Sequence, residues 1–254
     1  MSHLNLFGFT AFVTVGLLST VAWEPGRNVA IQVGTLASAS QPQPVRWSPE
    51  RSRGSVGGTL SGGRRGTEAT CGAATDRPTP VITLLVPGSG DGLLTTSPNP
   101  TFHWYAETQA AIDMTFVLQH PDEATPIYKQ TLQLTRSGMV SVALPTRYAL
   151  ETGTPYRWSV FFTCAHNAGE VVARSFIQRI DKAELHQQTE GRSPLEQGAI
   201  FARAGVWYDA VSRLVMAYQK APQNPEIKTG LQSLLQQAES EQSGQRLTLV
   251  SNKL

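Results

Sequence analysis

The chain has 254 residues, of which 16% are charged, and its formal net charge is +2 at pH 7. This near-neutral balance removes the main compositional argument for a nucleic-acid partner, because proteins that neutralise phosphates usually carry a strongly basic face. The length predicts one or two modest domains and leaves binding, structural and enzymatic roles open.

The amino terminus is a nearly continuous apolar run from Leu4 to Ala22, and no Asp, Glu, Lys or Arg precedes Glu24. A run of this kind that ends in small residues is typical of a secretory signal peptide. We predict that residues 1–22 are removed and that the mature protein is exported to the periplasm or cell envelope. The alternative is an uncleaved membrane anchor, because about twenty apolar residues can span a bilayer.

Residues 23–80 are predicted to be a disordered linker rich in Gly, Arg and Pro. Few apolar side chains and many glycines, as in Arg51–Arg65, make such a stretch costly to order. The simplest interpretation is a solvated spacer. The alternative is an electrostatic tether to an acidic surface such as lipid headgroups or a polyanionic glycan. Between about Ala37 and Pro80, Trp47 is the one residue that is a candidate anchor.

Residues 81–181 show the alternation of apolar and polar side chains that half-buried strands require. The alternation starts at Val81 and is clear from Ile112 to Gln119, and turn signals such as Glu151–Gly153 separate the runs. Connections this short are expected to join only antiparallel strands. The pattern therefore predicts a β-sandwich of about seven short strands.

The strongest local signature of this region runs from Leu150 to Cys164. A leucine, a glycine turn and Tyr156 precede an alternating strand that contains Trp158, and this order resembles the corner of an immunoglobulin- or fibronectin-like domain. The resemblance implies a structural role. The functional alternative places Trp104, Tyr105 and Trp158 on an exposed platform for sugar rings, although large aromatic residues in alternating strands are more often core.

The chain has two cysteines, Cys71 and Cys164. An even pair in an exported protein favours a disulfide. The predicted bond would clip the end of the linker to the aromatic strand and stabilise the fold by up to roughly 4 to 5 kcal/mol. A Cys164 nucleophile with His166 as its base is disfavoured, because strand residues two apart are held parallel rather than aimed at each other.

No motif predicts a catalytic, cofactor or metal site. The glycine-rich run Pro87–Gly92 lacks the lysine and the following helix of a phosphate cradle, and the five histidines show no zinc-ligand spacing. Solvated loop charges are the simplest interpretation of the acidic residues between the strands. A hydrolase would instead need two of them to face one cleft; the candidates are Asp113, Asp122, Glu123 and Glu170.

After Arg179 the apolar residues recur at helical spacing, so residues 182–240 are predicted to be helical and residues 241–254 a tail. Ser193–Glu196 has the pattern of a capped helix start, and further helices are predicted over about Trp207 to Lys220 and Glu226 to Glu239. One tetratricopeptide-like unit would need to pack against the sandwich or a partner, because it cannot bury its own apolar face. The residues that match such a unit are Gly198, Phe201, Gly205, Ala210, Leu214, Ala217 and Pro222.

An ordered set of short motifs resembles the largely cyanobacterial domain of unknown function 928. The resemblance covers roughly Arg46 to Ala238 and implies an exported protein of a cyanobacterium-like cell, with an uncharacterised role and no established catalytic residue. The motifs are Arg46-Trp47-Ser48-Pro49, Arg65-Gly66-Thr67, Cys71, Leu84-Leu85-Val86-Pro87, Pro100-Thr101-Phe102, Tyr156-Arg157-Trp158, Cys164, Ile177-Gln178-Arg179 and Tyr208-Asp209-Ala210.

Together these patterns predict an α+β protein, an antiparallel immunoglobulin- or fibronectin-like β-sandwich followed by a short C-terminal helical module. We interpret it as a non-enzymatic binding or adaptor module of the envelope with a protein partner. A carbohydrate-binding protein or a hydrolase with loop carboxylates is the alternative. Exposed aromatic and arginine side chains supply most binding energy at interfaces, and the candidates for a partner surface are Trp207, Tyr208, Arg213 and Tyr218. For Trp207, packing against the sandwich is the competing interpretation.

Overall fold

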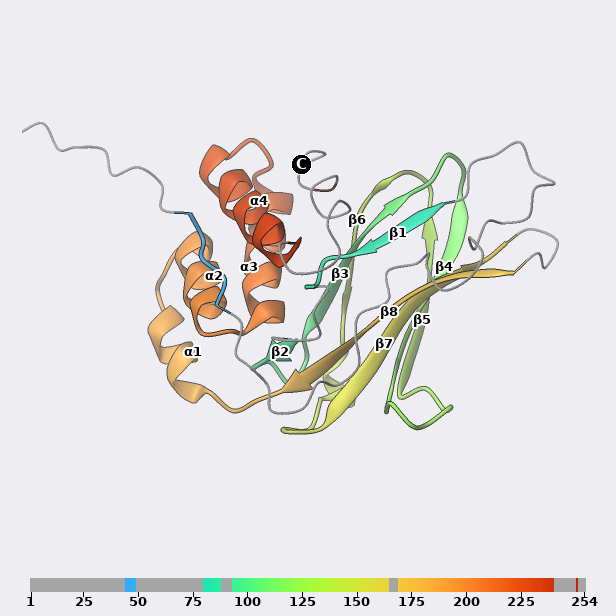
Figure 1. Ribbon diagram of the computed structural model, residues 1–254, viewed down its shortest axis with the longest axis horizontal. Coiled ribbons are helices and arrows are strands. Elements are labelled where there is room, and N and C mark those ends of the chain that lie inside the picture. Colours follow the sequence, from blue (N-terminus) through green and yellow to red (C-terminus); the bar gives the residue numbers. More distant parts are fainter. Residues whose placement is uncertain (1–43, 49–79, 88–92, 165–168, 240–249, 251–254) are drawn as a thin grey trace, which may run out of the picture. The chain divides into compact units, whose positions relative to one another are not determined.

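The computed structural model of the protein describes residues 44–48, 80–87, 93–164, 169–239 and 250 (Figure 1). The predictions for the signal peptide, for most of the linker, for Cys71 and for His166 fall outside these residues. Of the predicted tail, the structure describes Val250, whose side chain is buried in the core. All described residues belong to one compact unit of the chain, Gln41–Leu254.

Two sheets form the β part of the described chain (Figure 1). One has three strands in the order β1-β3-β6, and the other has five in the order β2-β8-β7-β4-β5. Alternating burial along β7 shows the predicted period of two. The strands are β1 (Val81–Leu84), β2 (Leu94–Thr95), β3 (Thr101–Glu107), β4 (Ile112–Gln119), β5 (Tyr128–Leu134), β6 (Gly138–Ala143), β7 (Pro155–Thr163) and β8 (Glu170–Arg179).

Strand β2 corrects the prediction that only antiparallel connections occur. Leu94 and Thr95 pair in parallel with Gln178 and Arg179 at the end of β8, whereas the other strand pairs described are antiparallel. Short turn signals constrain only strands that are neighbours in sequence, and β2 finds its partner more than eighty residues later. The mixed α+β class is confirmed, and the immunoglobulin- or fibronectin-like topology stays a prediction.

Aromatic side chains fill the space between the sheets. Phe102 of β3 lies 4.9 Å from Phe116 of β4 and 5.1 Å from Trp158 of β7, measured between ring centroids. Trp104 stacks on Phe116 with centroids 6.2 Å apart. Trp104 and Trp158 are fully buried, which agrees with the favoured core role and makes the alternative, a sugar-binding platform, wrong for these two residues. Tyr105 is half-buried.

The corner before β7 has the structural role that its sequence predicts. The Tyr156 hydroxyl accepts a hydrogen bond from the Glu151 N–H at 3.1 Å, and Gly153 has a φ of 81°, which a residue with a Cβ rarely adopts. Leu150 is buried, and its carbonyl accepts a hydrogen bond from Arg179 Nη1 at 2.9 Å. These contacts tie the turn to the end of β8.

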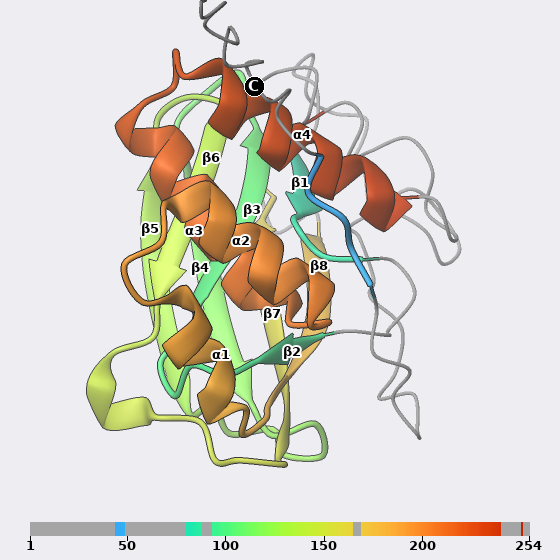
Figure 2. The ribbon, with the colours of Figure 1, turned by 90° about the vertical axis from the view of Figure 1, so that its left-hand side faces the viewer.

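In the described part of the chain, four helices follow the strands and gather on one side of the sheets (Figures 1 and 2). The predicted start at Ser193 is confirmed as a capping box. Its hydroxyl accepts from the Glu196 N–H at 3.3 Å, while its own N–H donates to the Glu196 carboxylate at 2.9 Å. The helices are α1 (Ala183–Thr189), α2 (Pro194–Arg203), α3 (Trp207–Lys220) and α4 (Pro225–Glu239); a 3₁₀ turn, Thr146–Tyr148, precedes β7.

Small residues allow α2 and α3 to pack closely, as predicted. A Cβ added to Gly198 would lie 2.8 Å from Leu214 Cγ, which is closer than real Cβ contacts allow. Gly205, in the connection between the two helices, has a φ of 76°. Phe201 and Ala210 are fully buried between the helices and the rest of the core. The helix pair is therefore established, and its tetratricopeptide identity stays a prediction.

Candidate binding site on the helical module

The start of α3 is locked into the core of the sheets. The Trp207 indole N–H donates to the Leu85 carbonyl at 2.8 Å. The Tyr208 hydroxyl accepts from the Trp158 indole N–H at 2.7 Å and donates to the Phe176 carbonyl at 2.6 Å. Burial raises the pKa of Tyr208, so the phenol keeps the proton that it donates.

This packing corrects the predicted partner surface. Trp207 and Tyr208 are almost completely buried, whereas Arg213 is exposed and Tyr218 is half-buried against the core. The four candidates do not form one exposed surface, because the first turn of α3 faces the sheets. The competing interpretation, packing of Trp207 against the sandwich, is confirmed by its bond to the carbonyl that follows β1.

The sequence analysis did not name Asp209 as a candidate site residue, although its carboxylate accepts three hydrogen bonds in the structure. One of its carboxylate oxygens accepts from the Thr95 hydroxyl at 2.8 Å and from the Thr96 N–H at 3.0 Å, and the other accepts from the Thr96 hydroxyl at 3.0 Å. Burial raises the pKa of Asp209, and the three hydrogen bonds oppose this shift. The carboxylate ties α3 to β2, and its partners lie more than a hundred residues away in sequence.

His103 forms a second polar link, between β3 and α3. Its Nδ1 lies 2.8 Å from the Ser141 hydroxyl and its Nε2 lies 3.1 Å from the Ser212 hydroxyl. Burial lowers the pKa of His103 to about 3, so the imidazole is neutral at pH 7. A general base works best with a pKa near the working pH, so this cluster is better suited to holding the helix on the sheet than to activating a serine.

The four carboxylates considered for hydrolysis are exposed. Asp113 lies on β4, Asp122 and Glu123 lie in the turn that follows it, and Glu170 begins β8. Within the described ranges, no three His, Cys, Asp or Glu side chains are grouped so that they could hold a metal ion. The observed exposure agrees with the interpretation of these side chains as solvated charges.

Residues 44–48, here named the strap, lie extended on the helices instead of being disordered (Figure 2, blue). The Val45 carbonyl accepts from Gln237 Nε2 at 2.5 Å and from the Ser233 hydroxyl at 3.3 Å. The Trp47 N–H donates to Gln237 Oε1 at 2.8 Å, and the Ser48 N–H donates to a carbonyl at the end of α2. These bonds correct the linker prediction for five residues.

Side chains of the strap enter the helical core as well. The Trp47 ring meets the Trp207 ring edge to face, with centroids 4.8 Å apart, so the predicted anchor is an anchor to the chain's own helix. Val45 is 1% exposed. A Cβ added to Gly230 of α4 would collide with the Leu195 side chain and lie 3.5 Å from Val45 Cγ2, so this glycine leaves room for both.

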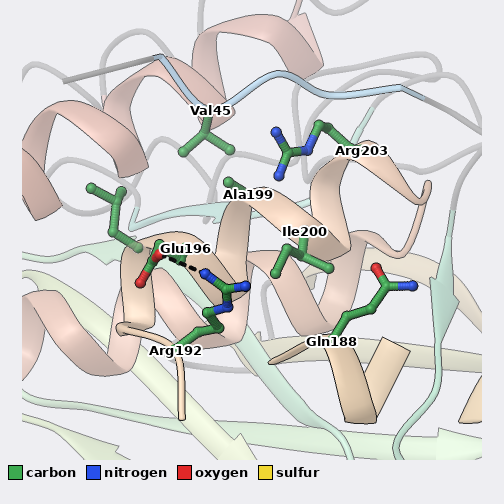
Figure 3. A pocket seen from close by; sticks show the side chains of 8 residues that line it. Val45, Gln188, Arg192, Glu196, Ala199, Ile200 and Arg203 are labelled. Atoms are coloured by element: carbon green, nitrogen blue, oxygen red, sulfur yellow. Dashed lines mark hydrogen bonds and ion pairs between the residues drawn. The ribbon is translucent and has the colours of Figure 1, made fainter. Parts of the chain in front are cut away.

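A pocket of about 520 Å³ lies beside the strap (Figure 3). Its apolar lining comes from the strap and from one side of α2, and polar side chains from α1, α2 and the turn between them stand around it. Figure 3 shows Val45 facing α2 across the pocket. The lining residues are Val45, Gln188, Arg192, Leu195, Glu196, Ala199, Ile200 and Arg203.

Two arginines and one glutamate give the pocket its charge. Arg192 pairs with Glu196 at 3.4 Å, and both side chains are more than half exposed. Hydrogen bonds from Ser193 are the main reason that the pKa of Glu196 is lowered, so this carboxylate stays charged. Arg203 has no hydrogen bond or ion pair with another residue of the described part. The pocket therefore combines an apolar wall with the positive charge of Arg203, which no other described residue offsets.

The fold and this site define the chain as an α+β protein in which a helical module rests on two sheets and carries an open pocket. The chain belongs to the family described as Domain of Unknown Function (DUF928), whose family model matches residues 60–247. The predicted family is thereby confirmed. The match includes the four helices and begins after the strap. No curated protein matches the chain.

None of the helices that the structure describes is both long and apolar enough to cross a membrane.

Proposed function

We propose that this protein is a non-enzymatic binding module of the cell envelope, and that the pocket between the strap, α1 and α2 receives an acidic peptide segment of a partner protein. The observation that carries the proposal is the combination in one pocket of an apolar wall with Arg203. A volume of about 520 Å³ falls within the range of pockets that enclose small ligands, roughly 300 to 1,000 Å³, so it accommodates one or two side chains of a peptide.

The charges of the pocket favour a carboxylate in the ligand. A guanidinium can bind a carboxylate through two parallel hydrogen bonds, and Arg203 has no such partner among the described residues. Glu196 carries a negative charge that Arg192 already offsets. An apolar side chain packed against Ala199 and Ile200, with an Asp or Glu nearby, therefore satisfies both parts of the site.

A library of random dodecapeptides displayed on phage tests the pocket with a defined probe. We expect enriched peptides to combine an aliphatic or aromatic residue with Asp or Glu, and their affinity to fall at least tenfold in the variant Ala199→Trp, which fills the pocket. Gln187→Trp, an exposed position of α1 outside the lining, is the matched control. Peptides that bind Ala199→Trp as tightly as the unmodified protein would place the binding site elsewhere.

The envelope location is part of the proposal and rests on the apolar run Leu4–Ala22 and on the cysteine pair. Intact mass and thiol titration of protein isolated from its native host test both together. A mass that lacks residues 1–22 and the absence of titratable thiols are expected. A full-length mass with two free thiols would contradict export by a removable signal and the bond between Cys71 and Cys164.

A further inference from the structure

We propose that the groove on α2, α3 and α4 that holds the strap is itself a peptide-binding site. Its ligand class is an extended peptide with a small aliphatic residue and, two positions later, an aromatic residue. The strap occupies the groove in cis and competes there with such a segment of a partner protein. This inference goes beyond the proposed function, because the groove shares only Leu195 with the helix residues that line the pocket and binds its ligand through the backbone.

Backbone recognition is the first reason. The Gln237 side chain donates to the carbonyl of Val45 and accepts from the N–H of Trp47, so one amide side chain pairs with both polar groups that an extended chain offers on one side. Ser233 adds a second donor to the same carbonyl. Main-chain bonds of this kind give affinity without depending on the sequence of the peptide.

Side-chain recognition supplies the sequence preference. Val45 fills a slot beside Gly230 and Leu195, and Trp47 packs edge to face on Trp207. The residues between and beside them, Pro44, Arg46 and Ser48, are exposed. Alternate side chains are therefore read by the helices and the others face solvent, which is the expected pattern for an extended peptide held along one edge.

The cis strap sets the conditions under which a partner could bind. It belongs to the same chain as the groove and therefore competes with a free peptide as an intramolecular ligand, at an effective concentration that the intervening chain sets. A free peptide of the same pattern must exceed that concentration in the unmodified protein. Weakening the strap while leaving the groove intact is therefore expected to reveal the site.

The probe is a fluorescein-labelled synthetic peptide of residues 42–50. The receptor is the full mature chain with Val45→Ser and Trp47→Ala in its strap. We expect this receptor to bind the peptide at least tenfold more tightly than the unmodified chain does, as measured by fluorescence anisotropy. Adding Gln237→Ala to the receptor should weaken binding at least tenfold. Adding Gln223→Ala, an exposed position between α3 and α4, should not.

Two results would overturn the proposal. One is no binding by a receptor whose circular dichroism and cooperative thermal transition match those of the unmodified chain. The other is equal binding of a peptide that carries the same two substitutions, because the slots for Val45 and Trp47 would then contribute nothing. If the substituted receptor fails to fold, the unmodified chain with a protease site inserted between residues 55 and 60 replaces it. After cleavage, this chain must exchange its own strap for the labelled peptide, and absence of exchange refutes the site.

Discussion

The two sides of the helical module are built differently. On the side toward the sheets, α3 hydrogen-bonds through Asp209, Tyr208 and Ser212 to strand residues far away in sequence, the last of these bonds being to His103. The Tyr208 and His103 side chains are buried. On the other side, the strap is held by backbone hydrogen bonds to Gln237 and by two side chains, Val45 and Trp47. The pocket beside it is open and lined by exposed charges. The first side suits a fixed attachment and the second suits a replaceable ligand.

The difference follows from what each side would lose if its contacts opened. A buried donor or acceptor that loses its partner costs about 1–3 kcal/mol. Separating α3 from the sheets would break several such hydrogen bonds at once. On the strap side, water can replace the lost bonds at the edge of the groove. Binding is therefore expected on the strap side, with stability concentrated on the sheet side.

Trp207 is the position where the two sides meet, and it gives the largest expected effect. Trp207→Ala removes a fully buried indole, its bond to the Leu85 carbonyl and its contact with Trp47. We expect the free energy of unfolding to fall by about 3–5 kcal/mol, as measured by urea denaturation. Met216→Ala, an exposed position of the same helix, should change it by less than about 0.5 kcal/mol. Equal effects would contradict the assignment of α3 to the core.

The second prediction uses the neutral imidazole that attaches α3 to the sheet. The folded protein holds the pKa of His103 at about 3, compared with 6.5 for the free side chain. Between these values the unfolded chain binds a proton that the folded chain does not. The contribution of His103 to the free energy of unfolding is therefore fully present above pH 6.5. It falls as the pH drops toward 3, by up to about 1.4 kcal/mol for each pH unit.

His103→Gln removes this dependence. Urea denaturation of both proteins between pH 7 and pH 4 should show a loss of stability in the unmodified protein that exceeds the loss in the variant by about 3 kcal/mol. Asp209, whose pKa is raised by burial, contributes with the opposite sign, because the folded state then binds the extra proton. Since it is present in both proteins, it cancels in the difference. Parallel pH profiles would mean that His103 is protonated in the folded state.

Alanine substitutions of two glycines, one on each side of the helical module, test this difference directly. Gly198→Ala would place a Cβ 2.8 Å from the branch carbon of Leu214, which is fully buried and has nowhere to move. We expect a loss of about 1–2 kcal/mol despite the better helix propensity of alanine. Gly230→Ala collides only with the tip of Leu195, which is half-exposed and can rotate, and its Cβ lies in ordinary van der Waals contact with Val45, at 3.5 Å. Its stability should be unchanged or higher by up to about 1 kcal/mol. Thermal denaturation of both variants distinguishes the two cases, and a reversed order would contradict the comparison.

The sequence predicted elements whose signals are local. The bounds of α3 agree with the helical spacing from Trp207 to Lys220, and the cap at Ser193 was readable because its partner is three residues away. The small residues of α2 and α3 also indicated a close helix pair. The family was recognisable from the order of short motifs, and the family match confirms it.

What the sequence missed depends on long-range pairing. In the sequence, Asp209 is an ordinary acidic residue of a first helical turn. Its role becomes visible only in the fold, which places Thr95 and Thr96 beside it. Trp207 stayed a candidate for both a partner surface and the core, because helical periodicity does not say which face of the helix the sheets cover. The strap has too few apolar residues to predict order, and it is ordered because Val45 and Trp47 use a core that other segments provide.

The smallest expected effect tests the exposed end of α2, next to the pocket. Ser193→Ala removes the hydroxyl that accepts the Glu196 N–H and leaves Glu196 free to turn toward Arg192. We expect a loss of about 1 kcal/mol, the usual value of an N-cap, measured by urea denaturation. Because Glu196 and Arg192 line the pocket, peptide affinity should change together with this small loss, whereas a cap that served stability alone would leave affinity unchanged. The test therefore separates the two roles of a position where the fold and the proposed site share residues.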